Sequence, residues 1–271
     1  MNDSFYNNFL KLYYRMSPLS IVLTIVIIVL ILMFVRYVFI DPYTLQQNIQ
    51  DGKTMSTIEA SSLATNGTNV PSTNFAYSIW FYVNDWNYRY GDSKVIFGRM
   101  GATTSGKNKG SIPGVNGSDP CPTVVLGPNT NNLSVSLGCY PGVGKKPKRG
   151  STTIVETCTV ANVPIQKWVH LVVSVHGRAM DLYIDGKLVR TCLLQGIASV
   201  NNNQPVYVTP AGGFNGWTSK LQYYPAPLNP QEVWNIYTRG YSNWSLSGMF
   251  NTYQVQVSLV ENGTTKGSIT V

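Results

Sequence analysis

The most informative stretch of the sequence reads WVHLVVSV over residues 168–175, followed by MDLYIDGKLV over residues 180–189. Valine, isoleucine, leucine and aromatic residues in short runs of this kind are typical of β-strands. Asp185 and Gly186 stand between two such runs, and this dipeptide is the strongest short-range signal for a two-residue hairpin turn. The stretch therefore predicts neighbouring antiparallel strands joined by tight turns.

Similar strand-like runs occur on both sides of this stretch. They cover residues 75–83, 94–99, 123–126, 133–137, 152–160 and 187–193. Turn-forming residues separate them, as in the segment GPNTNN over residues 127–132. One short helix is indicated by Asn229 as N-cap, Pro230 at the first helical position, Glu232 in the first turn and Gly240 as terminator. Many short strands with one helix predict an all-β sandwich or barrel.

The composition agrees with an all-β globular body. Of the 271 residues, 44% are apolar and only 12% are charged, which argues against intrinsic disorder and against a coiled coil. The net charge of +8 favours anionic partners. Because this excess arises from scarce acidic residues, we expect no nucleic acid among the partners.

Three segments resemble a known family. The run over residues 168–189, the helix segment LNPQEVWNIYTRG over residues 228–240 and the opening run FAYSIWFYV over residues 75–83 resemble laminin-G-like domains of the concanavalin A-like lectin/glucanase superfamily. The resemblance implies a jelly-roll sandwich of two curved sheets over residues 74–241. It implies no single function, because that superfamily includes lectins, hydrolases, adhesion modules and structural domains.

The two ends of the chain predict further segments. After the N-terminal residues 1–18, the apolar run over residues 19–40 would span about 33 Å as a helix and predicts an uncleaved single-pass transmembrane anchor. The polar residues 41–73 predict a stalk or linker. Residues 242–271 predict a C-terminal β-hairpin extension, which could pair with the sheet edge of a neighbouring molecule.

The sequence predicts no catalytic residues. A glucanase needs two carboxylates about 5–5.5 Å apart for retention or about 6.5–9.5 Å apart for inversion. The nearest pair, Asp181 and Asp185, would lie about 13 Å apart along a strand. The two histidines, His170 and His176, would lie about 20 Å apart and could not share a metal ion. We therefore expect a protein that is not an enzyme and needs no cofactor.

Calcium is the one cofactor that the sequence leaves open. Some laminin-G-like domains bind Ca²⁺ through carboxylates at a sheet rim. Asp85, Asp92 and Asp119 would be the donors here, although no calcium-binding motif contains them.

Two groups of residues are candidate contacts for partners. Trp86, Tyr88 and Tyr90 alternate with polar residues, as a sugar site of stacked rings and amides requires, and Trp217 and Trp244 could act likewise. The alternative is that these rings close the open ends of the sandwich. Lys145, Lys146, Lys148 and Arg149 form either a solvated loop or a contact for an anionic partner.

The four cysteines allow three pairings. A hairpin that pairs Leu126 with Leu133 would place Cys121 nearly opposite Cys139, so we predict a disulfide between them. The remaining pair would be Cys158 and Cys192.

Two functional hypotheses follow. An anchor, a stalk and a sandwich without catalytic residues favour a membrane-anchored scaffolding protein, and laminin-G-like domains behind a single anchor resemble virion proteins of large icosahedral DNA viruses. The resemblance implies a minor capsid or virion membrane protein, located between the inner membrane and the capsid, whose partners are the lipid bilayer and lattice-forming capsid proteins. The alternative is a lectin-like or adhesion module on a cell surface, which would bind glycans.

Overall fold

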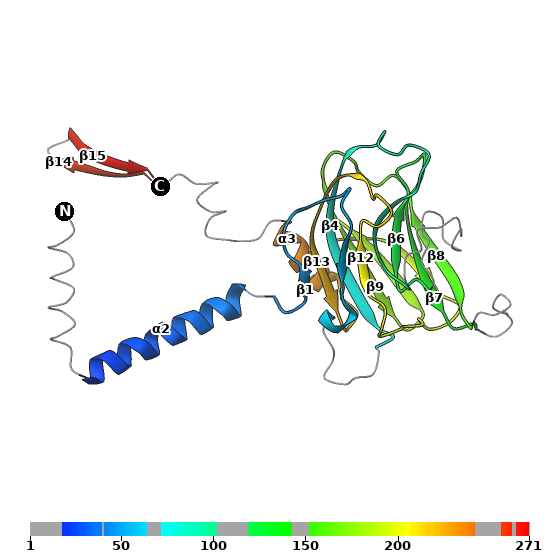
Figure 1. Ribbon diagram of the computed structural model, residues 1–271, viewed down its shortest axis with the longest axis horizontal. Helices are drawn as coiled ribbons and strands as arrows, with labels where there is room; N and C mark the ends of the chain where they lie inside the picture. Colours follow the sequence, from blue (N-terminus) through cyan, green and yellow to red (C-terminus); the bar gives the residue numbers. More distant parts are fainter. Residues whose placement is uncertain are drawn as a thin grey trace. The chain divides into compact units, whose positions relative to one another are not determined.

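The computed structural model describes residues 18–39, 41–63, 72–101, 119–142, 152–241, 256–261 and 264–270. The chain divides into two compact units, residues 1–42 and 43–271. The larger unit contains two antiparallel sheets packed face to face (Figure 1). This all-β sandwich with few helices fits the predicted jelly-roll class.

The first sheet has seven strands, six of them in the order β1-β13-β4-β9-β10-β11, with β2 also pairing with β13. These are β1 (Thr44–Gln46), β2 (Gln50–Asp51), β4 (Phe75–Asp85), β9 (Trp168–His176), β10 (Ala179–Ile184), β11 (Lys187–Leu193) and β13 (Asn215–Tyr224). The Asp185-Gly186 turn joins β10 to β11 as predicted, and both residues have positive φ angles, as this turn chemistry requires.

The second sheet has six strands in the order β3-β12-β5-β6-β7-β8. These are β3 (Ser56–Ile58), β5 (Lys94–Arg99), β6 (Thr123–Leu126), β7 (Leu133–Cys139), β8 (Ile154–Val160) and β12 (Val206–Val208). The inward residues of both sheets form one continuous hydrophobic core that includes Phe81, Leu171 and Val135. Burial of this core supplies the main favourable term in folding.

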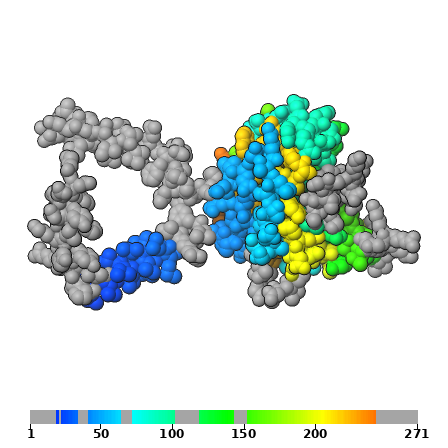
Figure 2. Space-filling model, in the orientation of Figure 1, coloured from blue at the N-terminus to red at the C-terminus, as the bar shows by residue number. Residues whose placement is uncertain are grey.

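Residues 44–58, which the sequence analysis assigned to a stalk, instead belong to the sandwich. Strand β1 pairs with β13, and β3 pairs with β12, so this segment extends both sheets. Figure 2 shows the segment lying along the surface of the larger unit (blue). The polar sequence of this segment did not indicate strands, because a short edge strand buries little apolar surface.

The smaller unit contains helix α2 (Pro18–Phe39), which coincides closely with the apolar run predicted as an anchor. Within the described part of the chain, no helix combines the length and the hydropathy needed to cross a membrane. The predicted transmembrane anchor is therefore not confirmed, although the predicted helix is present.

Helix α3 (Pro230–Thr238) lies on the outer face of the first sheet, where Val233 packs with Val172 of β9 and Tyr183 of β10. Its N-terminus has the predicted cap. Asn229 Oδ1 accepts a hydrogen bond from the Glu232 amide, and the Glu232 carboxylate accepts one from the Asn229 amide. This reciprocal capping satisfies two backbone donors that the helix itself cannot satisfy.

One of the two predicted disulfides is present. Cys158 of β8 is bonded to Cys192 of β11, which joins edge strands of opposite sheets. The predicted Cys121–Cys139 bond is wrong, because both residues are free, buried thiols.

The error has a simple geometric reason. Leu126 does pair with Leu133, but this register places Gly138, and not Cys139, opposite Cys121. The Gly138 amide accordingly donates to the carbonyl of Pro120, next to Cys121. Burial raises the pKa of each thiol to about 12, so both stay protonated at neutral pH.

The C-terminal hairpin consists of β14 (Gln256–Glu261) and β15 (Thr264–Thr270), within the segment where the sequence predicted one. These strands pair with each other and form a separate two-stranded sheet.

Candidate functional site

Four aromatic side chains form a row across the outer face of the seven-stranded sheet. We call Trp217, Tyr82, Trp168 and Tyr241 the aromatic row. Strands β13, β4 and β9 are neighbours, and their register places Trp217 beside Tyr82 and Tyr82 beside Trp168. Because Phe81 points into the core, Tyr82 points to the opposite face.

The rings of the aromatic row contact one another in sequence. The ring centroids of Trp217 and Tyr82 lie 5.4 Å apart, and those of Tyr82 and Trp168 lie 5.8 Å apart. Tyr241, three residues beyond α3, stacks on Trp168 with a centroid distance of 4.4 Å and an interplanar angle of 11°. Trp217 remains 41% exposed at the other end of the row. Tyr82 and Trp168 are half-buried within the row, and Trp217 and Tyr241 are its exposed members.

Residues beyond the end of α3 are held against the sheet by two hydrogen bonds. Ser219 Oγ donates to the carbonyl of Tyr241 at 2.7 Å, and Lys220 Nζ donates to the carbonyl of Gly240 at 2.8 Å. Gly240 has a φ angle of +72°, which glycine adopts without strain and which lets the chain turn back over the sheet. These contacts position Tyr241 on Trp168.

A second group of aromatic rings lies beside the row on the same face of the sheet. Trp80 stacks on His170 at 4.8 Å and on Tyr237 of α3 at 5.6 Å. Burial lowers the pKa of His170 to about 3, an effect that the nearby Asp185 carboxylate opposes. Its Nε2 forms a 2.9 Å hydrogen bond with Ser78 Oγ. His170 is therefore neutral at neutral pH and is packed between Trp80 and Tyr237.

Amide side chains lie beside the aromatic row. Asn84 and Gln166 are exposed and lie two residues from Tyr82 and Trp168, respectively. Gln166 Nε2 donates to the carbonyl of Asn84 at 3.4 Å, so the two residues are neighbours in space. Ring faces next to amides are the groups with which proteins bind sugars, since the rings pack on apolar faces and the amides bond hydroxyl groups.

The predicted triad of Trp86, Tyr88 and Tyr90 does not form one platform. The Lys94 ammonium lies 4.6 Å above the Trp86 ring, which also packs against the core. The Lys53 ammonium lies 5.1 Å above the Tyr88 ring, whose hydroxyl donates to the Gly212 carbonyl. Tyr90 alone is largely exposed. This geometry favours the alternative in which these rings close an end of the sandwich.

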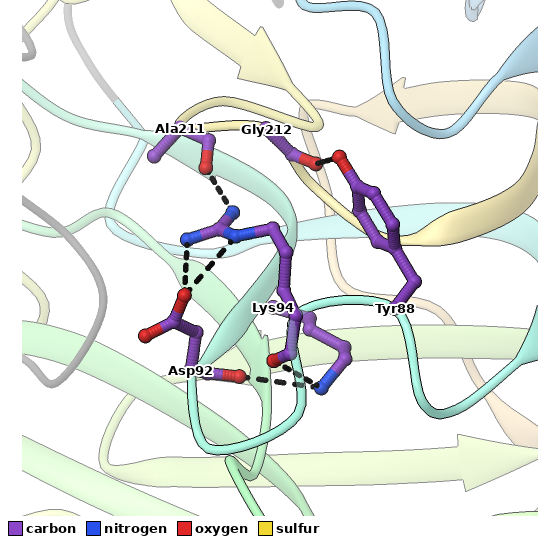
Figure 3. A network of polar contacts seen from close by, with 6 residues as sticks. Tyr88, Asp92, Lys94, Ala211 and Gly212 are labelled. Atoms are coloured by element: carbon purple, nitrogen blue, oxygen red, sulfur yellow. Dashed lines mark hydrogen bonds and ion pairs between the residues drawn. The ribbon is translucent and has the colours of Figure 1, made fainter.

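Tyr88 belongs to a polar network that holds the loop after β4 in place (Figure 3). Arg89 forms an ion pair with Asp92 at 3.3 Å and donates to the carbonyl of Ala211. Lys94 Nζ donates to the carbonyls of Arg89 and Asp92 at 3.2 and 3.3 Å. Burial lowers the pKa of Lys94. The network ties the loop after β4 to the loop before β13.

The other predicted site residues remain apart. Asp85 accepts a hydrogen bond from the amide of Asn87, and Asp92 is paired with Arg89, while Asp119 lies at the start of another segment. Among the described residues, no three His, Cys, Asp or Glu side chains come close enough to hold a metal ion. Trp244 and the cationic group of Lys145, Lys146, Lys148 and Arg149 lie outside the described residues.

Sequence reasoning singled out Trp217 but missed the rest of the aromatic row. Trp80 and Tyr82 occupy alternate positions of one strand, which places them on the same face, and this signal was available. The contact of Tyr82 with Trp168 and Trp217 depends on strand order. The position of Tyr241 depends on the path of the chain after α3. Neither follows from local sequence.

Comparisons with known proteins agree with the fold. The family model described as the concanavalin A-like lectin/glucanases superfamily matches residues 57–234. No curated protein matches the chain significantly.

One similar solved structure is the receptor-binding domain of botulinum neurotoxin C/D mosaic serotype. It is 12% identical in sequence, and the match covers 72% of this chain and 45% of the neurotoxin chain with a TM-score of 0.46. Another is the ligand-binding domain of botulinum neurotoxin serotype D in complex with N-acetylneuraminic acid. It is 12% identical, and the match covers 73% of this chain and 51% of that domain with a TM-score of 0.45. The chain thus spans about half the length of these structures.

Proposed function

Because the chain belongs to the concanavalin A-like lectin/glucanases superfamily, we propose that it is a lectin-like module that binds glycans at the aromatic row without cleaving them. The observation that carries the proposal is the continuous row of rings ending in the exposed Trp217, with the Asn84 and Gln166 amides beside it. A sugar ring placed on Trp217 would bury apolar area and bond the nearby polar groups.

Binding without hydrolysis is part of the proposal because Asp181 and Asp185, the one pair of aspartates considered for catalysis from the sequence, already have structural partners. Asp185 accepts a hydrogen bond from the His170 amide and forms an ion pair with Lys167 at 2.8 Å. Asp181 accepts a hydrogen bond from Thr191 Oγ1. Neither carboxylate is free to act as the acid or nucleophile that glycoside hydrolysis needs.

Replacing Trp217 with alanine should weaken glycan binding about tenfold, which corresponds to about 1.4 kcal/mol and is reasonable for the loss of one stacking ring. The measurement is titration of the full chain with glycans selected on an array. Trp234→Ala is the matched control, since Trp234 is similarly exposed (43%) but lies on α3, outside the row.

Two results would contradict the proposal. One is equal loss of binding in the Trp217 and Trp234 variants. The other is loss of binding in Tyr90→Ala with full binding in Trp217→Ala, which would move the site to the loop of the predicted triad.

A second candidate function, membrane-attached scaffolding, is favoured by helix α2. The side chains described over its middle are apolar and exposed, among them Leu23, Ile28 and Leu32. Such a surface is stabilised by an apolar partner, and lipid is the partner that we propose for it. The full chain should then float with phosphatidylcholine vesicles in a density gradient. A chain beginning at residue 43 should remain at the bottom, and flotation of both chains would assign lipid binding to the sandwich instead.

A further inference from the structure

Strand β11 is an open edge of the seven-stranded sheet. It pairs with β10 on one side, and no described strand pairs with its other side. All its residues except the disulfide-bonded Cys192 are exposed. Unpaired edge strands of this kind present a ready template for another strand.

The backbone of β11 shows which groups are available. The amide of Leu194, just beyond the strand, donates to the carbonyl of Arg178 on the β10 side. In an antiparallel ladder, alternate residues point their amide and carbonyl toward and away from the partner strand. Thr191 and Leu193 therefore direct these groups away from β10. Within the described part of the chain, nothing accepts from or donates to them.

Apolar side chains accompany this free edge. Leu193 is 76% exposed, and Leu188 and Val189 are about half exposed. Trp234 of α3, also exposed, lies against Gly186 at the turn that leads into β11. An added strand would gain backbone hydrogen bonds and would also cover this apolar surface.

We propose that β11 binds the C-terminal hairpin β14–β15 of a second copy of this chain. The hairpin forms a two-stranded sheet of its own, and a two-stranded sheet alone is marginally stable in water. Its strand β15 and strand β11 are both seven residues long. The described strands β14 and β15 pair with each other and not with β11, so pairing with β11 of a second copy would give both elements the partner strand that they lack.

The other edges of the sandwich are poorer acceptors. Strand β8 ends the second sheet, but its Thr159 carbonyl already accepts a hydrogen bond from Arg190 at 2.7 Å. The edge strands β1 and β3 have three residues each. Direct pairing of two β11 strands would place two strands that each carry Lys187 and Arg190 side by side, and the repulsion between these cations disfavours that arrangement.

The first test of β11 as the acceptor strand is the variant Thr191→Pro in the full chain. The protein is kept in mild detergent because α2 exposes apolar side chains. Proline removes a backbone donor, and at Thr191 that donor points away from β10, so the β10–β11 ladder keeps its bonds. Light scattering during size-exclusion chromatography should show a dimer for the natural chain and a monomer for the variant. Leu193→Lys, which places a charge on the same edge, should weaken dimerisation at least tenfold. Unchanged thermal unfolding would show that both variants fold.

A mixing experiment identifies the hairpin as the partner. A chain ending at residue 255 lacks the hairpin but keeps the edge, whereas Thr191→Pro lacks the edge but keeps the hairpin. Each should be monomeric alone, and the two should form a 1:1 complex when mixed. Val155→Lys on β8 is the control and should still dimerise.

Three outcomes would overturn the proposal: a natural chain that is monomeric, a Thr191→Pro chain that still dimerises, or a mixture that does not associate. Loss of dimerisation in Val155→Lys alone would place the acceptor on β8. The glycan-binding proposal does not depend on any of these results, because the aromatic row is intact in each variant.

Discussion

Loss of the Cys158–Cys192 disulfide is expected to lower the free energy of unfolding by about 4 kcal/mol. The bond closes a segment of 34 residues and holds together edge strands of opposite sheets. Most of its effect comes from restricting the unfolded chain, and a loop of this length gives a contribution of that size. The measurement is urea-induced unfolding of the double variant Cys158→Ala/Cys192→Ala beside the natural chain, with the free energies compared in the absence of urea.

Reductant provides the control for this prediction. Dithiothreitol should destabilise the natural chain by a similar amount and leave the double variant unchanged, because Cys121 and Cys139 are already free thiols. Equal destabilisation of both chains by the reductant would show that the effect does not arise from this bond.

His170 is expected to make the sandwich sensitive to acid. Its pKa is about 3 in the folded chain, because of burial, and about 6.5 when the chain is unfolded. The folded state thus keeps His170 neutral while the unfolded state binds a proton below pH 6.5. Stability due to this residue is complete above pH 6.5 and is lost as the pH falls to about 3, by up to about 5 kcal/mol in total.

The test is the free energy of unfolding at pH 7, 6, 5 and 4. In the natural chain it should fall by up to about 1.4 kcal/mol per pH unit from this residue alone, in addition to any effect of carboxylates. His170→Gln should be less stable at pH 7, because it disturbs the contacts with Trp80 and Ser78, but its stability should fall less steeply with pH. His176→Gln is the control, because the other histidine is exposed at the end of β9. Equal slopes in all three chains would refute the prediction.

The sandwich was predictable because its evidence is local. The Asp185-Gly186 turn, the capped helix after Asn229 and the apolar strand runs each follow from side chains close together in the sequence, and the structure contains all of them. The Cys158–Cys192 bond was also correct, but it was obtained by elimination after a first pairing that was wrong. The predicted pairing of Leu126 with Leu133 is correct, but within that register Cys121 and Cys139 are offset by one residue.

The site was less predictable because it is formed by elements far apart in the sequence. The aromatic row takes one ring each from β13, β4, β9 and the segment after α3. Trp86 and Tyr88 fit the sugar-binding pattern equally well in the sequence, yet cations cover their rings in the structure. Only tertiary packing distinguishes an accessible ring from one that is covered.

The attachment of Gly240 and Tyr241 also determines how the sandwich would respond to mechanical tension. Within the described part of the sandwich, force applied through the C-terminal segment reaches Tyr241 first, and it loads the hydrogen bonds from Ser219 and Lys220 to the carbonyls of Tyr241 and Gly240. These two hydrogen bonds and the Tyr241–Trp168 stack would break one after another, before force acts on the hydrogen bonds between the strands of the sheet. The segment would then yield at low force, uncover the Trp168 ring and leave the core intact.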